Sequence, residues 1–165
     1  MYDPRQVQPG DVILVRGAAI WDVLAALIRL ATVSPYHHAV LVGEGHLIEA
    51  GFIVTRSPLD KYVRTGDAFS VRCTRQRAHR AVAAAEARLG TPYGVAELLD
   101  DAGRYFLHLP LVYPWNARRQ TCSGLVAYAY RAAGVPLTYQ PCPSPGSLSY
   151  SPLLKGRRPW ENGGT

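Results

Sequence analysis

The run HAVLVGEGHLIEAGFIVTR, residues 38–56, favours an antiparallel sheet over a helical arrangement. Short apolar, β-branched stretches alternate in it with glycine, a pattern typical of strands joined by tight turns. The strands predicted from it cover 38–42, 46–50 and 52–56, with a turn at Gly43-Glu44-Gly45. The flanking runs GDVILVRG and AFSVRC predict two more strands, so the expected sheet is built mainly from residues 11–73.

Helical patterns take up most of the remaining chain. The predicted helices, in chain order, are 18–33, one turn at Ser57-Pro58 in SPLDKYV, 75–90, 94–106, and a helix that begins at Cys122 and stops at Gly134. Prolines predict a connecting loop over 107–119 and an irregular tail after residue 140. Strands that cluster early and helices that cluster late predict an α+β domain.

Composition limits the class of protein. The 165 residues are 48% hydrophobic and 18% charged, which predicts one globular domain over 1–165 with a core over about 9–150. The net charge of +6 favours anionic partners, but the basic residues are scattered and match no nucleic-acid module, so we expect no nucleic acid. Three cysteines at irregular spacings form no CxxC pair, and they predict neither a metal site nor a disulfide framework.

The N-terminal residues lack the basic-then-apolar layout of a signal peptide. The most apolar run, AAIWDVLAALIRLATV, is interrupted by Asp22 and Arg29 and is short for a membrane span. We therefore expect a cytoplasmic protein, with export by a phage or secretion route and peripheral membrane contact left open. The sequence does not indicate an oligomeric state.

Cys122 is predicted in the first turn of its helix, in TCSGLVAYAYRAAG, with Thr121 as N-cap. The unpaired N–H groups and the dipole at that end favour a thiolate and can hold the oxygen of an attacked carbonyl. Cys122 also shares a helical face with Leu125 and Val126, so a buried core cysteine is the alternative. The helix alone leaves both readings open.

A nucleophilic cysteine needs a histidine base and a group that orients it. His37 and His38 open a predicted strand and face opposite sides of it, so either ring could face a site. Glu49 lies on the returning strand, across the glycine turn, and could pair near His38. Because LIEAG surrounds Glu49 with apolar residues, a buried carboxylate there would need partners.

The segment SPYHHAVLVGEGHLIEA resembles the histidine segment of NlpC-type papain-like cysteine hydrolases, and LGTPYG followed by TCSGLVAYAYRAAG resembles their cysteine segment. In most members the cysteine segment comes first, whereas here it comes last. That order resembles the circularly permuted branch, the YiiX/YaeF-like amidases, in which the third residue is often a glutamate. The resemblance covers roughly residues 9–150 and implies a small papain-like α+β fold, with a curved antiparallel sheet packed against the helix that carries the cysteine.

The resemblance implies Cys122 as nucleophile, His38 as general base and Glu49 as the orienting acid, with His37 the rival to His38. Residues implied near the substrate or the oxyanion are Tyr93, Ser123 and Gln120. The implied activity is that of a cysteine peptidase or amidase without a cofactor, which cleaves an amide, isopeptide or ester bond through a thioester. The implied substrates are cell-wall peptides or lipids. The alternatives are a lipid acyltransferase or thioesterase of the same fold, and a non-catalytic phage or structural protein.

Overall fold

The structure is a computed structural model, and it describes residues 1–16, 34–92, 121–140 and 143–156. The strands are β1 (Val12–Arg16), β2 (Tyr36–Val42), β3 (Leu47–Ala50), β4 (Val54–Ser57), β5 (Gly66–Val71) and β6 (Leu154–Gly156). The helices are α2 (Arg75–Glu86), α4 (Cys122–Ala132) and α5 (Pro145–Ser149). The helices predicted over 18–33 and 94–106 and the loop over 107–119 lie outside the described residues.

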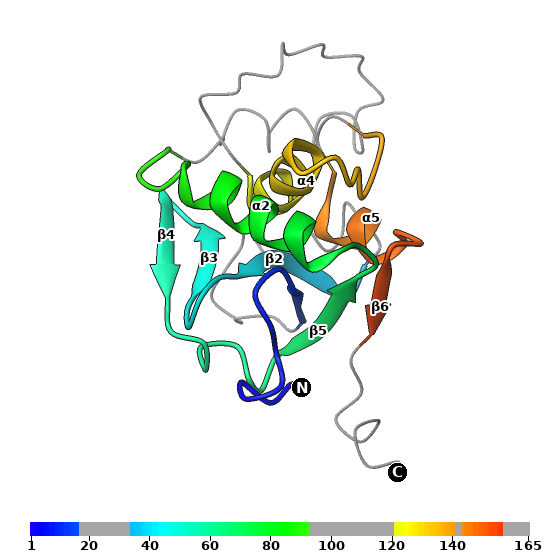
Figure 1. Ribbon diagram of the computed structural model, residues 1–165. Helices are drawn as coiled ribbons and strands as arrows, with labels where there is room; N and C mark the ends of the chain where they lie inside the picture. Colours follow the sequence, from blue (N-terminus) through cyan, green and yellow to red (C-terminus); the bar gives the residue numbers. More distant parts are fainter. Residues whose placement is uncertain (17–33, 93–120, 141–142, 157–165) are drawn as a thin grey trace, which may run out of the picture.

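The six strands form one antiparallel sheet in the order β4-β3-β2-β1-β5-β6. β1 lies inside the sheet, and Val12, Ile13 and Leu14 are fully buried because both faces of the sheet are covered there. The expected α+β class and the early sheet are therefore present. Figure 1 shows α2, α4 and α5 on one side of the sheet.

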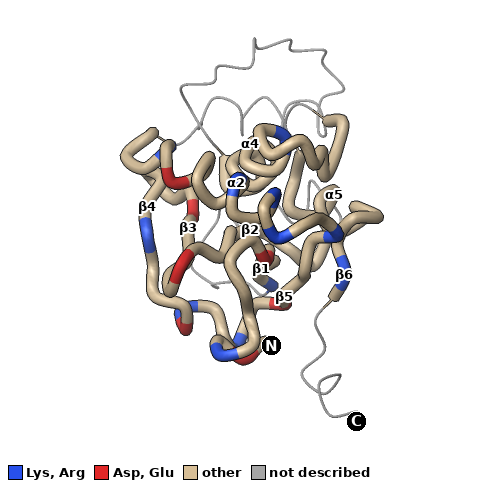
Figure 2. Tube along the Cα trace, in the orientation of Figure 1, with Lys and Arg blue, Asp and Glu red and all other residues tan. Residues whose placement is uncertain are grey.

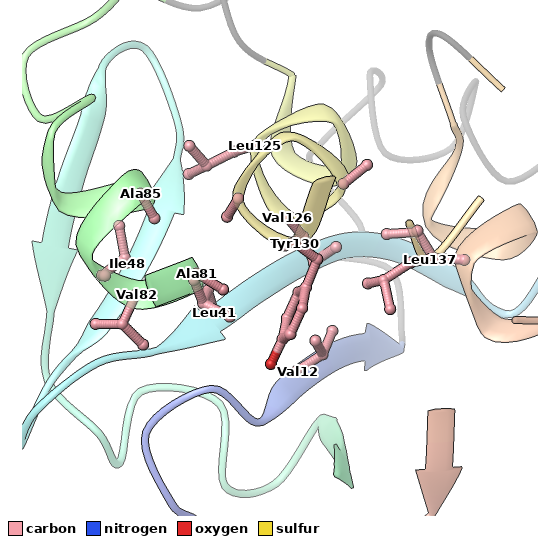
Figure 3. Packing of buried hydrophobic residues seen from close by; sticks show 14 of the residues in the cluster. Val12, Leu41, Ile48, Ala81, Val82, Ala85, Leu125, Val126, Tyr130 and Leu137 are labelled. Atoms are coloured by element: carbon pink, nitrogen blue, oxygen red, sulfur yellow. The ribbon is translucent and has the colours of Figure 1, made fainter. Parts of the chain in front are cut away.

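Side-chain alternation along the strands divides the core in two. On the helix side, Leu41 of β2 and Ile48 of β3 pack against Val82 of α2 and Leu125 of α4, as Figure 3 shows. On the opposite face, Val40 and other strand residues pack with residues from the N-terminal segment and the β4–β5 connection. Each face of β2 and β3 therefore has its own cluster, which fixes the register of both strands.

One hydrogen bond ties the N-terminal segment to α4. The Tyr130 hydroxyl, which is fully buried, donates to the carbonyl of Gly10 across 120 positions of sequence. Gly10 has a φ of +93°, and a Cβ there would lie 2.7 Å from the Cβ of Ala78. Glycine adopts this φ without strain and leaves room for Ala78.

Two sequence predictions are wrong in the described residues. Ser57 is the last residue of β4 and its hydroxyl donates to Glu49, so it caps no helical turn; successive turns follow it instead. The sequence predicts an irregular tail after residue 140, whereas the structure has α5 and the edge strand β6 there. Ser144 caps α5 by accepting from the N–H of Ser147, and Pro145 occupies the first helical position.

Charged side chains are spread over several elements. Figure 2 shows Lys and Arg on α2, β4 and β6, with Asp and Glu between them on neighbouring segments. Within the described residues, no helix combines the length and the apolar character needed to cross a membrane.

Candidate active site

Cys122 is the first residue of α4, and its position is fixed by the cap that precedes it. The Thr121 hydroxyl accepts from the N–H of Gly124 at 3.0 Å. A Cβ on Gly124 would lie 2.5 Å from that hydroxyl oxygen, so this position needs glycine for the cap to close. Cys122 is 4% exposed, and its place at the helix N-terminus puts its sulfur beside unpaired backbone N–H groups.

His38 and Glu49 come from neighbouring strands of the sheet. The ladder between β2 and β3 pairs Leu41 with Ile48 and Val42 with Leu47, and both site residues lie beyond it, away from the turn. Nε2 of His38 lies 3.0 Å from Oε2 of Glu49. Because Nε2 faces Glu49, Nδ1 is the ring nitrogen left for the hydrogen bond between His38 and Cys122.

Glu49 is 3% exposed and accepts hydrogen bonds on both oxygens. Oε1 accepts from the Ser57 hydroxyl and from Nζ of Lys61, the latter at 2.5 Å. Oε2 accepts from the Tyr62 hydroxyl at 2.6 Å as well as from His38. Four donors thus satisfy a carboxylate that would otherwise be costly to bury.

The electrostatics of the three residues favour a charged pair. Burial disfavours the thiolate, but the charge and hydrogen bond of His38, with the backbone N–H groups of Ala39 and Ser123, lower the pKa of Cys122 from 9.0. Burial also disfavours the imidazolium, yet Cys122 and Glu49 raise the pKa of His38 from 6.5 to about 9. Both shifts favour the form of the pair in which His38 holds the proton and Cys122 is a thiolate.

The pKa of Glu49 is lowered well below its usual range. Burial works in the opposite direction, but it is outweighed by the donors His38, Lys61, Ser57 and Tyr62. Glu49 is therefore ionised at neutral pH, and it supplies a negative charge beside His38.

The remaining predicted site residues lie as follows. Ser123 follows Cys122 on α4; its backbone N–H points at the sulfur, while its hydroxyl donates to the carbonyl of Pro143 at 2.5 Å. Tyr93 and Gln120 lie outside the described residues. His37 lies on β2 at a register irregularity, where Val15 pairs with His38 and Arg16 with Tyr36.

Sequence reasoning missed three side chains that hold Glu49, namely Ser57, Lys61 and Tyr62. Ser57 ends β4, and Lys61 and Tyr62 lie in the segment that leads from β4 to β5. The Tyr62 ring also contacts the His38 ring, with centroids 5.8 Å apart and planes inclined by 60°. The one sequence signal for such donors was the carboxylate itself, placed within the apolar run LIEAG.

The described residues do not fit a metal site. Within residues 1–16, 34–92, 121–140 and 143–156, no group of three or more His, Cys, Asp or Glu side chains is arranged to hold a metal ion. Glu49 in particular already accepts from four donors, one of them the ammonium of Lys61. Its oxygens are therefore poorly disposed to bind a cation.

Comparison with known proteins gives a likeness of fold. No protein-family model matches the chain, and no curated protein matches it. Among solved structures, that of yiiX from Escherichia coli O157:H7, described as a metalloprotein and as DUF1105, matches with a TM-score of 0.72 at 19% sequence identity. The match covers 93% of this chain and 98% of yiiX. The chain therefore has a yiiX-like α+β fold.

Proposed function

We propose that the protein is a cysteine hydrolase of the peptidase or amidase type, and that its fold is the circularly permuted papain-like arrangement of NlpC-type enzymes. The observation that carries the proposal is the buried chain of hydrogen bonds from Cys122 through His38 to Glu49. Such a chain supplies a nucleophile, a base and a group that orients the base. The chain order, with the histidine strand before the cysteine helix, supports the permuted arrangement.

The first half of the reaction forms a thioester. The Cys122 thiolate attacks the carbonyl carbon of an amide, isopeptide or ester, and negative charge develops on the carbonyl oxygen. We expect backbone N–H groups at the start of α4, including that of Ser123, to stabilise this charge. The tetrahedral intermediate collapses when His38 donates its proton to the leaving nitrogen or oxygen, which leaves the acyl group on sulfur.

The second half releases the acyl group. Neutral His38 takes a proton from water, the resulting hydroxide attacks the thioester, and Cys122 leaves as a thiolate while His38 is again protonated. Glu49 keeps its charge throughout and holds Nε2 of His38, so that Nδ1 stays directed at the sulfur. Amides and esters of cell-wall peptides and of lipids are the substrate classes that we propose to test first.

The test combines thiol reactivity with acyl-enzyme capture. Wild type, Cys122→Ser and His38→Ala are alkylated with iodoacetamide from pH 4 to 9 and analysed by peptide mass spectrometry. Separate samples that have not been alkylated are incubated with p-nitrophenyl esters and with a panel of peptide and lipid amides. We expect Cys122 to react at a pH well below that of a free thiol, and His38→Ala to remove this advantage. Turnover should fall by at least about 100-fold in both variants.

Cys73→Ser is the matched control, because Cys73 is a second free cysteine and burial raises the pKa of its thiol. This variant should hydrolyse substrates as the wild type does. A Cys122 that reacts like an ordinary thiol and ignores His38 would contradict the proposal and indicate a core cysteine. One equivalent of stable acyl-enzyme without turnover would instead indicate an acyltransferase.

A further inference from the structure

Three of the four donors to Glu49 come from one short segment. Ser57 ends β4, and Lys61 and Tyr62 follow within the successive turns that lead to β5. Two of the four donors can carry a positive charge, and they bind different oxygens: Nζ of Lys61 contacts Oε1 at 2.5 Å, while Nε2 of His38 contacts Oε2 at 3.0 Å. The buried carboxylate is thus shared between two cations.

Lys61 is placed to act on His38 through Glu49. Its side chain is 44% exposed, so the ammonium keeps part of its hydration while it binds the carboxylate. Nζ also lies 5.1 Å from the centroid of the Tyr62 ring, and that ring in turn contacts the ring of His38. Lys61, Tyr62 and His38 therefore form a connected set around one carboxylate.

The consequence follows from charge balance. With Cys122 as thiolate and His38 as imidazolium, the site holds two negative and two positive charges when Glu49 and Lys61 are included. Without the ammonium, Glu49 would stabilise the imidazolium more strongly, and His38 would release its proton to a leaving group less readily. The thiolate would also lose the attraction of one nearby cation.

The charged and titratable groups around Glu49 come from each element packed against it. His38 lies on β2, Cys122 on α4 beyond His38, and Lys61 and Tyr62 on the β4–β5 connection. Beyond the residues that contact Glu49, Tyr2 of the N-terminal segment interacts with Tyr62, and Asp60 interacts with Tyr2.

We propose that Lys61 is a positioning residue that sets, through Glu49, the pH range over which Cys122 and His38 form an ion pair. This inference rests on the proposed function, since the ion pair is the reactive form of the site. Lys61 does not touch the reacting atoms. It holds Glu49 ionised and moderates the pull of that carboxylate on the His38 proton.

The experiment measures Cys122 alkylation by iodoacetamide against pH, with thiolate absorbance near 240 nm as a second readout, so it needs no substrate. The profile is expected to have an acid limb, where Cys122 ionises and the ion pair forms, and an alkaline limb, where His38 loses its proton. Lys61→Met should shift both limbs to higher pH, by roughly half a unit to one unit. The acid limb moves because the thiolate loses a cation, and the alkaline limb moves because the imidazolium loses a repulsive neighbour. Lys61→Arg should keep both limbs in place.

Two further variants isolate the cause. Lys61→Gln keeps a hydrogen-bond donor without the charge, and it also serves if Lys61→Met folds poorly; it should shift the limbs as the methionine does. Lys155→Met is the matched control, because Lys155 is the other lysine of the chain and lies on β6. It should leave both limbs unchanged.

The outcomes separate this inference from the proposed function. If wild-type Cys122 shows no ion-pair limbs, the proposed function fails together with the inference. If the wild type shows both limbs but Lys61→Met and Lys61→Gln leave them in place, only the role of Lys61 is overturned. A loss of alkylation rate without movement of either limb would indicate a purely structural role and would also overturn it.

Discussion

At the scale of single residues, the site depends on how a buried carboxylate is satisfied. Glu49 accepts from one imidazole, one ammonium and two hydroxyl groups, and none of its oxygens faces apolar surroundings unpaired. This arrangement favours the protonated form of His38, because a carboxylate that remains ionised stabilises the imidazolium. The donors to Glu49 therefore belong to the site as much as the three residues of the hydrogen-bonded chain do.

Glu49→Gln tests this dependence directly. The amide has no charge and turns an NH₂ group toward donors, so the pKa of His38 should fall from about 9. The rate of Cys122 alkylation at pH 6 should fall by at least about tenfold. The titration of the His38 ring proton by NMR and the alkylation rate are the two measurements.

Glu86→Gln is the matched control for that substitution. Glu86 of α2 also pairs with a histidine, since its Oε1 lies 2.5 Å from Nε2 of His46, and it binds Arg56 as well. The control should change neither the His38 titration nor the reactivity of Cys122. An unchanged His38 pKa in Glu49→Gln would show that the thiolate alone holds the proton on the ring.

The sequence was informative about some site residues for physical reasons. His38 and Glu49 share one hairpin, so strand alternation and a glycine turn suffice to bring them close. Cys122 lies at the start of a helix, and the sequence signals this helix by the N-cap residue before it and by the apolar periodicity that follows. Lys61 and Tyr62 lie in aperiodic turns, and the path of such a segment depends on the tertiary contacts around it.

At the scale of elements, the same distinction holds. The strands and the two long helices follow from apolar periodicity, with boundaries that move by a few residues. Gly90 has a φ of +79°, as expected of a glycine that ends a helical segment, yet α2 itself ends at Glu86. α5 and β6 are short, and β6 forms only because β5 offers a free edge. The local sequence of β6 does not reveal whether another strand has an edge available for pairing.

Thr121→Val is a prediction about α4 as an element. The hydroxyl accepts from Gly124 and fixes the first turn, which carries the sulfur of Cys122 and the N–H of Ser123. Its loss should lower the free energy of unfolding by about 1 kcal/mol. It should also slow Cys122 alkylation, because the N–H groups that favour the thiolate become less ordered.

Thr74→Val serves as the comparison, since Thr74 caps α2 by accepting from the N–H of Arg77. Urea unfolding should show a loss of stability in both variants, whereas alkylation should slow only in Thr121→Val. Equal alkylation rates in the two variants would mean that the cap contributes to stability alone.

At the scale of the whole molecule, the site lies where the helical side and the sheet meet. Cys122 comes from α4, and His38 and Glu49 come from strands of the sheet. α4 is also held at its other end, where Tyr130 donates to Gly10. The proposed catalysis should therefore require the whole packed domain, since unfolding of either part would separate the Cys122 sulfur from His38.

Tyr130→Phe tests whether the stability of the domain can be lowered without a change in the reactivity of Cys122. It removes a buried hydroxyl and leaves the Gly10 carbonyl with one donor fewer, so the free energy of unfolding should fall by about 1 to 2 kcal/mol. The pH profile of Cys122 alkylation should not change, because Tyr130 lies two turns along α4 from the sulfur. Urea unfolding and alkylation measure the two effects, with Tyr128→Phe on the same helix as control. A displaced pH profile would contradict this separation.

The ion pair also determines how stability depends on pH. In the proposed ion pair, the proton that the unfolded chain holds on Cys122, with a pKa of 9.0 when unperturbed, lies on His38, whose pKa rises from 6.5 to about 9. Between about pH 6.5 and 9, the unfolded pair holds one proton on the thiol and the folded pair holds one on the imidazole. The number of bound protons is then equal, so the pair gives stability no pH dependence in this window. Below pH 6.5 the unfolded pair binds a second proton, and the stabilisation by the pair decreases.

Cys122→Ser removes the compensating group and should expose the titration of His38. In this variant the largest cause that raises the pKa of His38 is gone, and Glu49 alone opposes the lowering by burial. We expect Glu49 to prevail, so that above about pH 6.5 only the folded state holds the proton and stability falls as the pH rises. The difference in free energy of unfolding between wild type and variant should grow by up to about 1.4 kcal/mol per pH unit. Urea unfolding of both proteins from pH 6 to 9 measures it, and the other histidines cancel in the difference. A difference that stays constant across this range would contradict the prediction, because it would mean that Glu49 does not raise the pKa of His38 in the folded variant.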